Sequence, residues 1–263
     1  MTMQKNTYLE FGHEFDLESR LNLIKSTGFD GIFIWQYENI DKLEKVIALA
    51  RAKHLNIETM HLRFEGCNNL WLENPEGETY VESILEGINL AHQYHIPTVI
   101  MHTVAKEVHP PVSDIGLKRI RMILNVCEAK NVQCAIENIR DLEYIDTVFE
   151  TFSSPVLKMC FDSGHTNCFS YRLPEVDFQK YARKIVCVHL HDNLGDYDAH
   201  LVSLTGTIDF KHIMQSLNTI GFQGPLTSEA HIGEDEIVDD EAFLKKVYAS
   251  LVQLEQLMGD TNE

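Results

Sequence analysis

The chain has 263 residues, of which 44% are hydrophobic; this is enough for a substantial core and excludes a disordered or collagen-like protein. The 40 acidic residues outnumber the 22 Lys and Arg, giving a formal net charge of −18, so the chain offers no basic surface for nucleic acid, which we do not expect as a partner. It has neither an apolar run of the roughly 20 residues that cross a bilayer nor a signal-peptide pattern, and we expect a soluble, cytoplasmic protein with no membrane partner.

Eight short apolar runs alternate with longer amphipathic runs, and no linker interrupts them, which predicts a single domain over residues 1–263. The predicted strands span residues 7–11, 31–35, 57–61, 98–102, 133–137, 157–162, 185–191 and 226–229. The predicted helices span residues 17–26, 40–53, 77–95, 113–130, 142–151, 177–182, 210–220 and 241–257. Eight βα units in about 250 residues are typical of a (β/α)8 TIM barrel, the α/β fold that we expect. The alternative, a doubly wound open sheet, usually carries a Gly-rich phosphate turn after its first strand, and this chain has none there.

Six successive predicted strands end in residues of the types that bind metal ions. Because TIM-barrel enzymes carry their active site at the carboxyl ends of the strands, these side chains are expected to meet. In the predicted strand 185–191, His189 and His191 alternate with apolar residues, so both are expected to point into the barrel mouth. A lone strand-end histidine is more often a cap or a core hydrogen-bonding group, and it is the coincidence that favours a metal centre. The strand-end residues are His61, His102, Glu137, Asp162, His189, His191 and Glu229.

Two carboxylate and histidine pairs extend this set into the loops. Asp162 and His165 are three residues apart at a Gly-containing turn, a spacing that can bring both side chains to one ion. Asp198 and His200 are two residues apart and face the same side if their loop is extended. A mixture of oxygen and imidazole donors suits Zn, Mn or Fe(II) better than Mg or Ca. The sequence therefore predicts a divalent transition metal as cofactor.

Five short segments occur in an order found in a known family. They are AIEN at 135–138, FDSGH at 161–165, VHLHDN at 188–193, LTGTIDF at 204–210 and TSEA at 227–230. Through them the chain resembles the xylose isomerase-like TIM-barrel superfamily, which holds sugar phosphate isomerases and epimerases and also endonuclease IV. The resemblance extends from Gly28 to the last predicted helix, and the ordered set is far more specific than any single motif.

The resemblance implies a ligand set for one to three Zn, Mn or Fe ions. Four residues match the ligands of the single Mn-like ion of the ketose 3-epimerase branch, namely Glu137, Asp162, His189 and Glu229. Five more match the positions that complete the three-zinc site of endonuclease IV, namely His61, His102, His165, Asp198 and His200. Ligand identity therefore does not separate the two branches.

The acidic composition favours a small substrate, and the segment LRFEGCNNLW after His61 has one Arg and no basic cluster. The leading hypothesis is a divalent-metal-dependent isomerase or epimerase of a small sugar or sugar derivative that acts through an enediolate. Glu137 and Glu229 are the expected catalytic pair, because one carboxylate can remove the proton beside the carbonyl and the other can return it. The candidate substrate-binding residues are His13, Trp35, Arg63, Trp71, Arg140 and His191.

Two other functions remain open at this point. One is an endonuclease IV-like phosphoesterase with several metal ions, in which Glu137 would bridge metals. The other is a barrel that binds a metal or a sugar without turnover, because a fold alone does not establish activity. The epimerase branch often carries an Arg near the position of Asp198 and His200, and its absence here weakens a direct ketose 3-epimerase assignment. The sequence identifies neither the sugar nor whether the chain forms a homo-oligomer.

Overall fold

The computed structural model describes residues 2–13, 16–169, 176–233 and 238–259, and within them eight parallel strands form one sheet. The strands are β1 (Lys5–Tyr8), β2 (Gly31–Trp35), β3 (Asn56–His61), β4 (Thr98–Met101), β5 (Gln133–Glu137), β6 (Leu157–Asp162), β7 (Ile185–His189) and β8 (Leu226–Ser228). Their order is β7-β6-β5-β4-β3-β2-β1-β8. Leu190, immediately after β7, pairs in parallel with Ser228 of β8 and brings the two edge strands together. The predicted (β/α)8 TIM barrel is confirmed.

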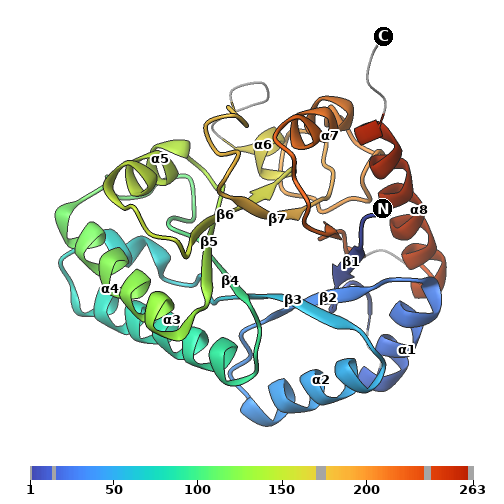
Figure 1. Ribbon diagram of the computed structural model, residues 1–263, viewed down its shortest axis with the longest axis horizontal. Coiled ribbons are helices and arrows are strands. Elements are labelled where there is room, and N and C mark those ends of the chain that lie inside the picture. Colours follow the sequence, from blue (N-terminus) through green and yellow to red (C-terminus); the bar gives the residue numbers. More distant parts are fainter. Residues whose placement is uncertain (1, 14–15, 170–175, 234–237, 260–263) are drawn as a thin grey trace.

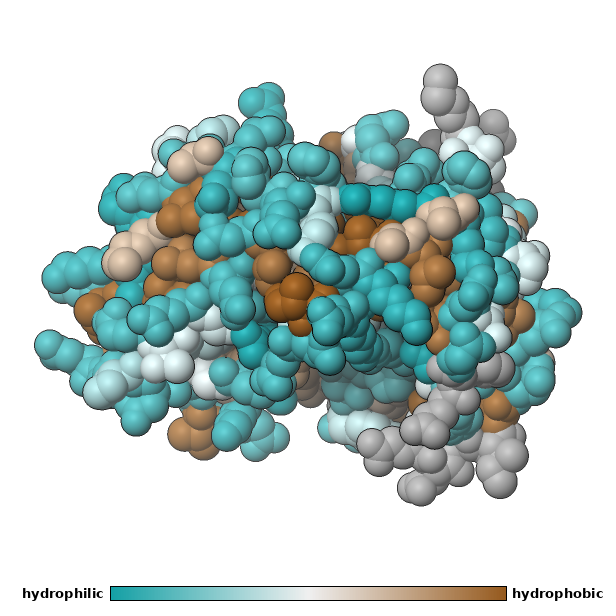
Figure 2. All heavy atoms as spheres, turned by 90° about the horizontal axis from the view of Figure 1, so that it is seen from below, coloured by the Kyte–Doolittle hydropathy of each residue, from teal (hydrophilic) through white to brown (hydrophobic). Residues whose placement is uncertain are grey.

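The helices surround the sheet, as Figure 1 shows. They are α1 (Leu17–Thr27), α2 (Ile40–Ala52), the 3-10 helix η1 (Cys67–Trp71), α3 (Pro75–Gln93), α4 (Asp114–Lys130), α5 (Leu142–Thr151), α6 (His165–Cys168), α7 (Phe210–Thr219) and α8 (Asp240–Gly259). Several begin after a residue whose side chain accepts from a free main-chain N–H, such as Asp16 before α1 and Ser113 before α4. Their apolar faces pack against the strands, and the outer face seen in Figure 2 is largely hydrophilic with hydrophobic side chains interspersed.

One predicted helix is wrong, and two short helices were not predicted. Residues 178–184 form turns in place of the predicted helix 177–182. Asp177 does accept hydrogen bonds from the backbone of Gln179 and Lys180, at 3.0 and 3.2 Å, but the chain then enters β7 before a full helix can form. The short helices η1 and α6 instead follow β3 and β6, at the carboxyl ends of the strands.

The barrel interior is layered, because side chains alternate along each strand. The strand-end histidines and carboxylates form the layer at the carboxyl end. Two residues below them on four successive strands lie Ile100, Ala135, Cys160 and Cys187, a small buried cluster separate from the main core. The main core lies between the strands and the helices. Within the described residues, no helix combines the length and the hydrophobicity needed to cross a bilayer.

Candidate active site

A cavity of about 290 Å³ opens at the carboxyl ends of the strands. The two predicted ligands outside its lining, Asp162 and His189, are almost fully buried and contact residues that belong to the lining. The structure thus brings all nine predicted ligands together. The seven that line the cavity are His61, His102, Glu137, His165, Asp198, His200 and Glu229.

The first group of donor atoms lies at the ends of β3, β4 and β5. Glu137 Oε2 is 2.6 Å from His102 Nε2 and 3.3 Å from His61 Nε2, and the two ring nitrogens are 3.2 Å apart. Ligand atoms around a tetrahedral zinc ion lie roughly 3.3 Å from one another, because each is about 2.0–2.1 Å from the metal. Two of the three distances match that spacing, and the third, between Glu137 and His102, is a hydrogen-bond distance.

The second group shares Glu137 and lies deeper. Glu137 Oε1 and Glu229 Oε2 are 2.7 and 3.0 Å from His189 Nδ1. With Asp162, these residues offer four ligand atoms that all lie within 4.8 Å of one another. Because its two oxygens face different groups, Glu137 joins the two sets.

The third group lies on the loops after β6 and β7. Asp198 Oδ2 is 3.2 Å from His165 Nε2 and 3.3 Å from His200 Nε2. His191 Nδ1 lies 3.8 Å from the other oxygen of Asp198. β7 ends at His189, and His191 follows it fully buried, with its Nε2 2.9 Å from Asp162 Oδ2, so its ring contacts the donor groups at the carboxyl end of the barrel.

Main-chain carbonyls orient three of the histidines. The Nδ1 atoms of His61, His165 and His200 lie 2.8, 2.8 and 3.2 Å from carbonyl oxygens of Leu62, Asn138 and Glu229. A carbonyl can only accept, so the proton of each neutral ring is held on Nδ1. The Nε2 lone pair of each ring is then free to bind an ion.

The second layer of contacts fixes the loop after β6. Asn138 Nδ2 donates to the Asp162 carbonyl at 2.9 Å, and the Asp162 N–H donates back to Asn138 Oδ1 at 2.7 Å. Gly164 is required by the space available, since a Cβ atom there would lie 1.9 Å from Cε1 of the His191 ring. These contacts fix the position of Asp162 relative to the other ligand atoms of the second donor group.

The residues fit the metal that the fold family implies. Several buried polar atoms have no hydrogen-bond partner in the described part of the chain, which is costly unless another group satisfies them. A divalent ion in the third donor group would satisfy two of them. These two atoms are His191 Nδ1 and Asp198 Oδ1.

The charges of the cluster keep the carboxylates of Glu137 and Glu229 ionised. Burial opposes ionisation of Glu137, but the charge of His189 and hydrogen bonds from the surrounding histidines hold its pKa well below the usual range. Burial likewise raises the pKa of Glu229, and His189 outweighs that effect and lowers it. Burial lowers the pKa of His165 and His200, while the neighbouring carboxylates raise the two values to about 10 and about 9. The cluster is thus a strong site for positive charge.

The predicted substrate-binding residues divide between the cavity and other places. Trp35 and Arg140 line the cavity. Arg63 instead forms ion pairs with Glu38 and Glu86, and Trp71 is buried against Tyr144 with its Nε1 donating to a main-chain carbonyl. His13 lies in a different surface hollow, beside α1 and α2, and His191 lies beneath the cavity.

Sequence reasoning missed four aromatic residues of the lining, namely Tyr8, Phe64, Phe169 and His231. Trp35 Nε1 donates to the Tyr8 hydroxyl at 2.7 Å, and burial raises the Tyr8 pKa, so its O–H proton remains available to a ligand. Burial and the charge of His200 lower the pKa of His231 to about 4, so this ring stays neutral near pH 7. The position of His231 two residues after Glu229 was a usable signal, whereas Tyr8 required the correct limits of β1.

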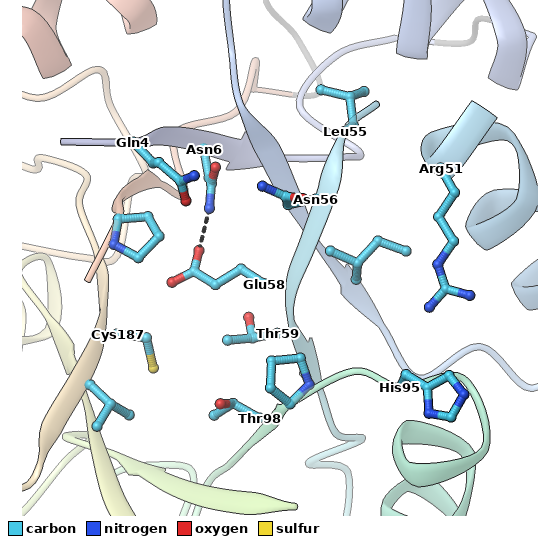
Figure 3. Close-up of a pocket in the computed structure, with 14 residues that line it drawn as sticks. Gln4, Asn6, Arg51, Leu55, Asn56, Glu58, Thr59, His95, Thr98 and Cys187 are labelled. Atoms are coloured by element: carbon cyan, nitrogen blue, oxygen red, sulfur yellow. Dashed lines mark hydrogen bonds between the residues drawn. The ribbon is translucent and has the colours of Figure 1, made fainter. Parts of the chain in front are cut away.

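A second cavity, of about 430 Å³, lies at the amino ends of the strands and is shown in Figure 3. Glu58 of β3 accepts hydrogen bonds there from Asn6 of β1, at 2.7 Å, and from the Thr227 hydroxyl of β8. These bonds cross the barrel interior and connect β3 to β1 and β8 at its amino end. Burial raises the pKa of Glu58. Since TIM-barrel chemistry belongs to the opposite end, we place the candidate active site at the carboxyl-end cavity.

Fold and donor set together define a TIM barrel with a candidate site for several metal ions at its mouth. Residues 21–247 match the family described as "Xylose isomerase-like TIM barrel", and the chain belongs to this family. Protein y4fM of Sinorhizobium fredii is 23% identical over 196 residues, which make up 70% of this chain and 62% of that protein. The chain thus matches less than two thirds of that relative.

Solved structures share the fold at low sequence identity. A D-tagatose 3-epimerase-like protein superposes with a TM-score of 0.79 at 19% identity, covering 98% of this chain and 99% of that one. D-Psicose 3-epimerase from Clostridium cellulolyticum H10 superposes with a TM-score of 0.75 at 13% identity, covering 98% and 99% of the two chains.

Proposed function

We propose that the protein is a divalent-metal-dependent isomerase or epimerase of a small sugar or sugar derivative. The observation that carries this proposal is the placement of Glu137 and Glu229 at the cavity. Both carboxylates contact His189, and one oxygen of Glu137 lies within 4.8 Å of one oxygen of Glu229. Two carboxyl groups held beside the same bound substrate can act as base and acid on one of its carbon atoms.

The cavity suits one sugar unit. Its volume of about 290 Å³ is at the small end of ligand pockets. Tyr8, Trp35 and Phe64 supply aromatic surface for a sugar face, and the Tyr8 hydroxyl can donate to a sugar oxygen. The two epimerase-related structures described above support a sugar as substrate through their shared fold.

In the proposed reaction, Glu137 or Glu229 removes the proton from the carbon beside the carbonyl, and an enediolate forms. The carboxyl group that took the proton can return it to the neighbouring carbon while the hydroxyl proton moves to the former carbonyl oxygen, which gives isomerisation. Delivery of a proton to the opposite face by the other carboxyl group, which takes that proton from solvent, gives epimerisation. A divalent ion, when bound by Glu137, Asp162, His189 and Glu229, would polarise the carbonyl oxygen as a Lewis acid. Asp162 and His189 would serve only as ligands.

A second candidate function, phosphoester hydrolysis, is favoured by one observation. Glu137 belongs to two donor groups, and a third group lies around Asp198, so the cluster has room for more than one ion. Two or three ions can clamp the attacking and leaving oxygens of a phosphoester. The net charge of −18 disfavours DNA as its substrate.

Assays on the purified protein would separate these functions. The zinc-, manganese- and iron-loaded protein is incubated with a panel of ketoses, aldoses and sugar phosphates, and separately with a duplex that carries one abasic site. We expect metal-dependent interconversion of at least one sugar, which a chelator abolishes, and no incision of the duplex. Efficient metal-dependent incision without sugar turnover would replace the proposal with the phosphoesterase, and binding without any turnover would favour a non-catalytic barrel.

A further inference from the structure

Arg140 is the single Lys or Arg among the described residues that line the candidate active site. Its guanidinium carbon lies 3.8 Å from the centre of the Phe169 ring. Phe169 stacks in turn on His165, with ring centres 4.9 Å apart. The guanidinium is thus held against Phe169, and Phe169 contacts His165 of the third donor group.

Arg140 forms no ion pair in the part of the chain that the structure describes, and its buried Nε lacks a hydrogen-bond acceptor, as do those of Arg63 and Arg119. Two other arginines of this acidic chain do pair with glutamates. Arg63 forms ion pairs with two glutamates, at 3.2 and 2.9 Å, and Arg119 forms one at 2.8 Å. An unpaired guanidinium inside a cavity of a chain with net charge −18 is therefore a position prepared for an external anion.

The backbone holds Arg140 in an unfavourable conformation. Its φ is +51°, in the left-handed region that L-residues with a side chain rarely adopt. The Asp141 N–H donates to the Ile139 carbonyl at 2.5 Å and closes a tight turn around it, directly between β5 and α5. His200 of the third donor group also has a positive φ, +46°. Five described residues other than glycine, all outside the cavity lining, also have a positive φ, so this conformation shows only that the surrounding structure fixes Arg140.

We propose that Arg140 binds an anionic group of the substrate, either a carboxylate or a phosphate. This inference rests on the proposed function and narrows its substrate to a sugar acid or a sugar phosphate. A guanidinium presents two parallel N–H donors that match both kinds of anion, and stacking on Phe169 fixes the plane of that fork. A neutral sugar would leave the guanidinium unpaired.

Binding to the metal-loaded protein tests the assignment without requiring turnover. Titration calorimetry compares D-fructose, D-fructose 6-phosphate and D-glucuronate on the wild type, Arg140→Gln and Arg140→Lys. We expect at least one charged sugar to bind more tightly than fructose, and Arg140→Gln to weaken that binding at least about tenfold, the effect of one charge-assisted hydrogen bond. Lys keeps the charge and loses the fork, so Arg140→Lys should recover only part of the loss. The phosphate and carboxylate arms identify which anion is preferred.

Arg121→Gln is the matched control, because Arg121 also stacks on a phenylalanine, Phe152 at 4.8 Å, but on the outside of α4. It should leave all three affinities unchanged, and equal melting temperatures would show that both variants fold. Equal binding of charged and neutral sugars by the wild type, or an equal loss of both in Arg140→Gln, would overturn the assignment. Arg140-dependent binding without turnover of any sugar would instead refute only the proposed function. Turnover of neutral sugars with the same KM in Arg140→Gln would refute only this inference.

Discussion

In three histidines of the candidate active site, the backbone sets which ring nitrogen faces the donor groups. His61, His165 and His200 each place Nδ1 against a carbonyl oxygen, which directs Nε2 toward the donor groups. The residue types and their strand-end positions could be predicted from the sequence. The choice of ring nitrogen could not, because it depends on carbonyls whose positions only the folded loops define.

The carboxylate pair provides the first prediction. Glu137→Gln and Glu229→Gln keep the shape of the side chain but remove the base, so each should lower turnover by about 10²- to 10⁴-fold. Metal affinity should fall less than in Asp162→Ala or His189→Ala, provided the amide oxygen still coordinates. Steady-state rates and metal content measured on the same preparations check this. Near-normal turnover of both Gln variants with metal bound would mean that the glutamates are only ligands.

The second prediction concerns Gly164. Gly164→Ala places a Cβ 1.9 Å from the ring of His191, which must move away from Asp162. We expect metal affinity to fall by about 10- to 100-fold, as for other changes in the residues that support metal ligands. Gly259→Ala, where a Cβ meets nothing within 4 Å, is the control. Competition with a chromophoric chelator measures both, and equal affinities would contradict the role given to Gly164.

Among the elements, β1 shows where sequence patterns fail. The apolar run at residues 7–11 predicted a strand there, but β1 is Lys5–Tyr8 and contains mostly polar residues. Asn6 faces the barrel floor and donates to Glu58, and Lys5 pairs with Glu255 of α8 at 2.5 Å. Polar side chains with long-range partners remove the hydrophobic signal of this strand. The limits of β2 were predicted correctly, and those of β3 to β8 to within two residues, because their apolar runs are clear and those of β3 to β8 end in conspicuous His, Asp or Glu residues.

The segment between β3 and α3 provides the third prediction. Arg119 of α4 is 2% exposed and donates to the carbonyl oxygens of Asn69, Leu70 and Leu72, at 2.8, 3.0 and 2.6 Å. Arg119→Met keeps the length of the side chain but leaves these carbonyls unsatisfied, which should reduce the free energy of unfolding by about 2–4 kcal/mol. Denaturant unfolding measures it, with the exposed Arg121→Met as control. A loss no larger than that of the control would contradict this account of how η1 is held.

At the scale of the molecule, the metal-free protein should carry extra protons. The pKa values of His165 and His200, raised to about 10 and about 9, keep both rings protonated at pH 7.5, whereas an ion binds only neutral imidazole. Burial lowers the pKa of His189, but Glu229 and Glu137 raise it well above the ordinary value, so zinc binding at all three donor groups should release about three protons per chain from His165, His189 and His200. A titration in weak buffer measures the release, and its absence at pH 7.5 would show that the rings are neutral without metal.

The same shifts fix the sign of the pH dependence. Both folded values lie above the ordinary value of 6.5, so protonation stabilises the metal-free fold fully below about pH 6.5. That contribution is lost as the pH rises through about 9 to 10. Zinc affinity should rise with pH up to this interval and level off above it, because zinc then no longer has to displace protons from these rings.

Solvent deuterium provides the most direct test of the central claim, that Glu137 and Glu229 transfer a proton on a sugar. The metal-loaded protein converts its substrate in D2O, and nuclear magnetic resonance locates the label in the product. We predict deuterium at the carbon that gains the proton beside the carbonyl, with the rate of labelling reduced in Glu137→Gln and Glu229→Gln as much as turnover is. Product that forms over many turnovers without label would contradict the account, because a hydride shift would then replace proton transfer by the two glutamates.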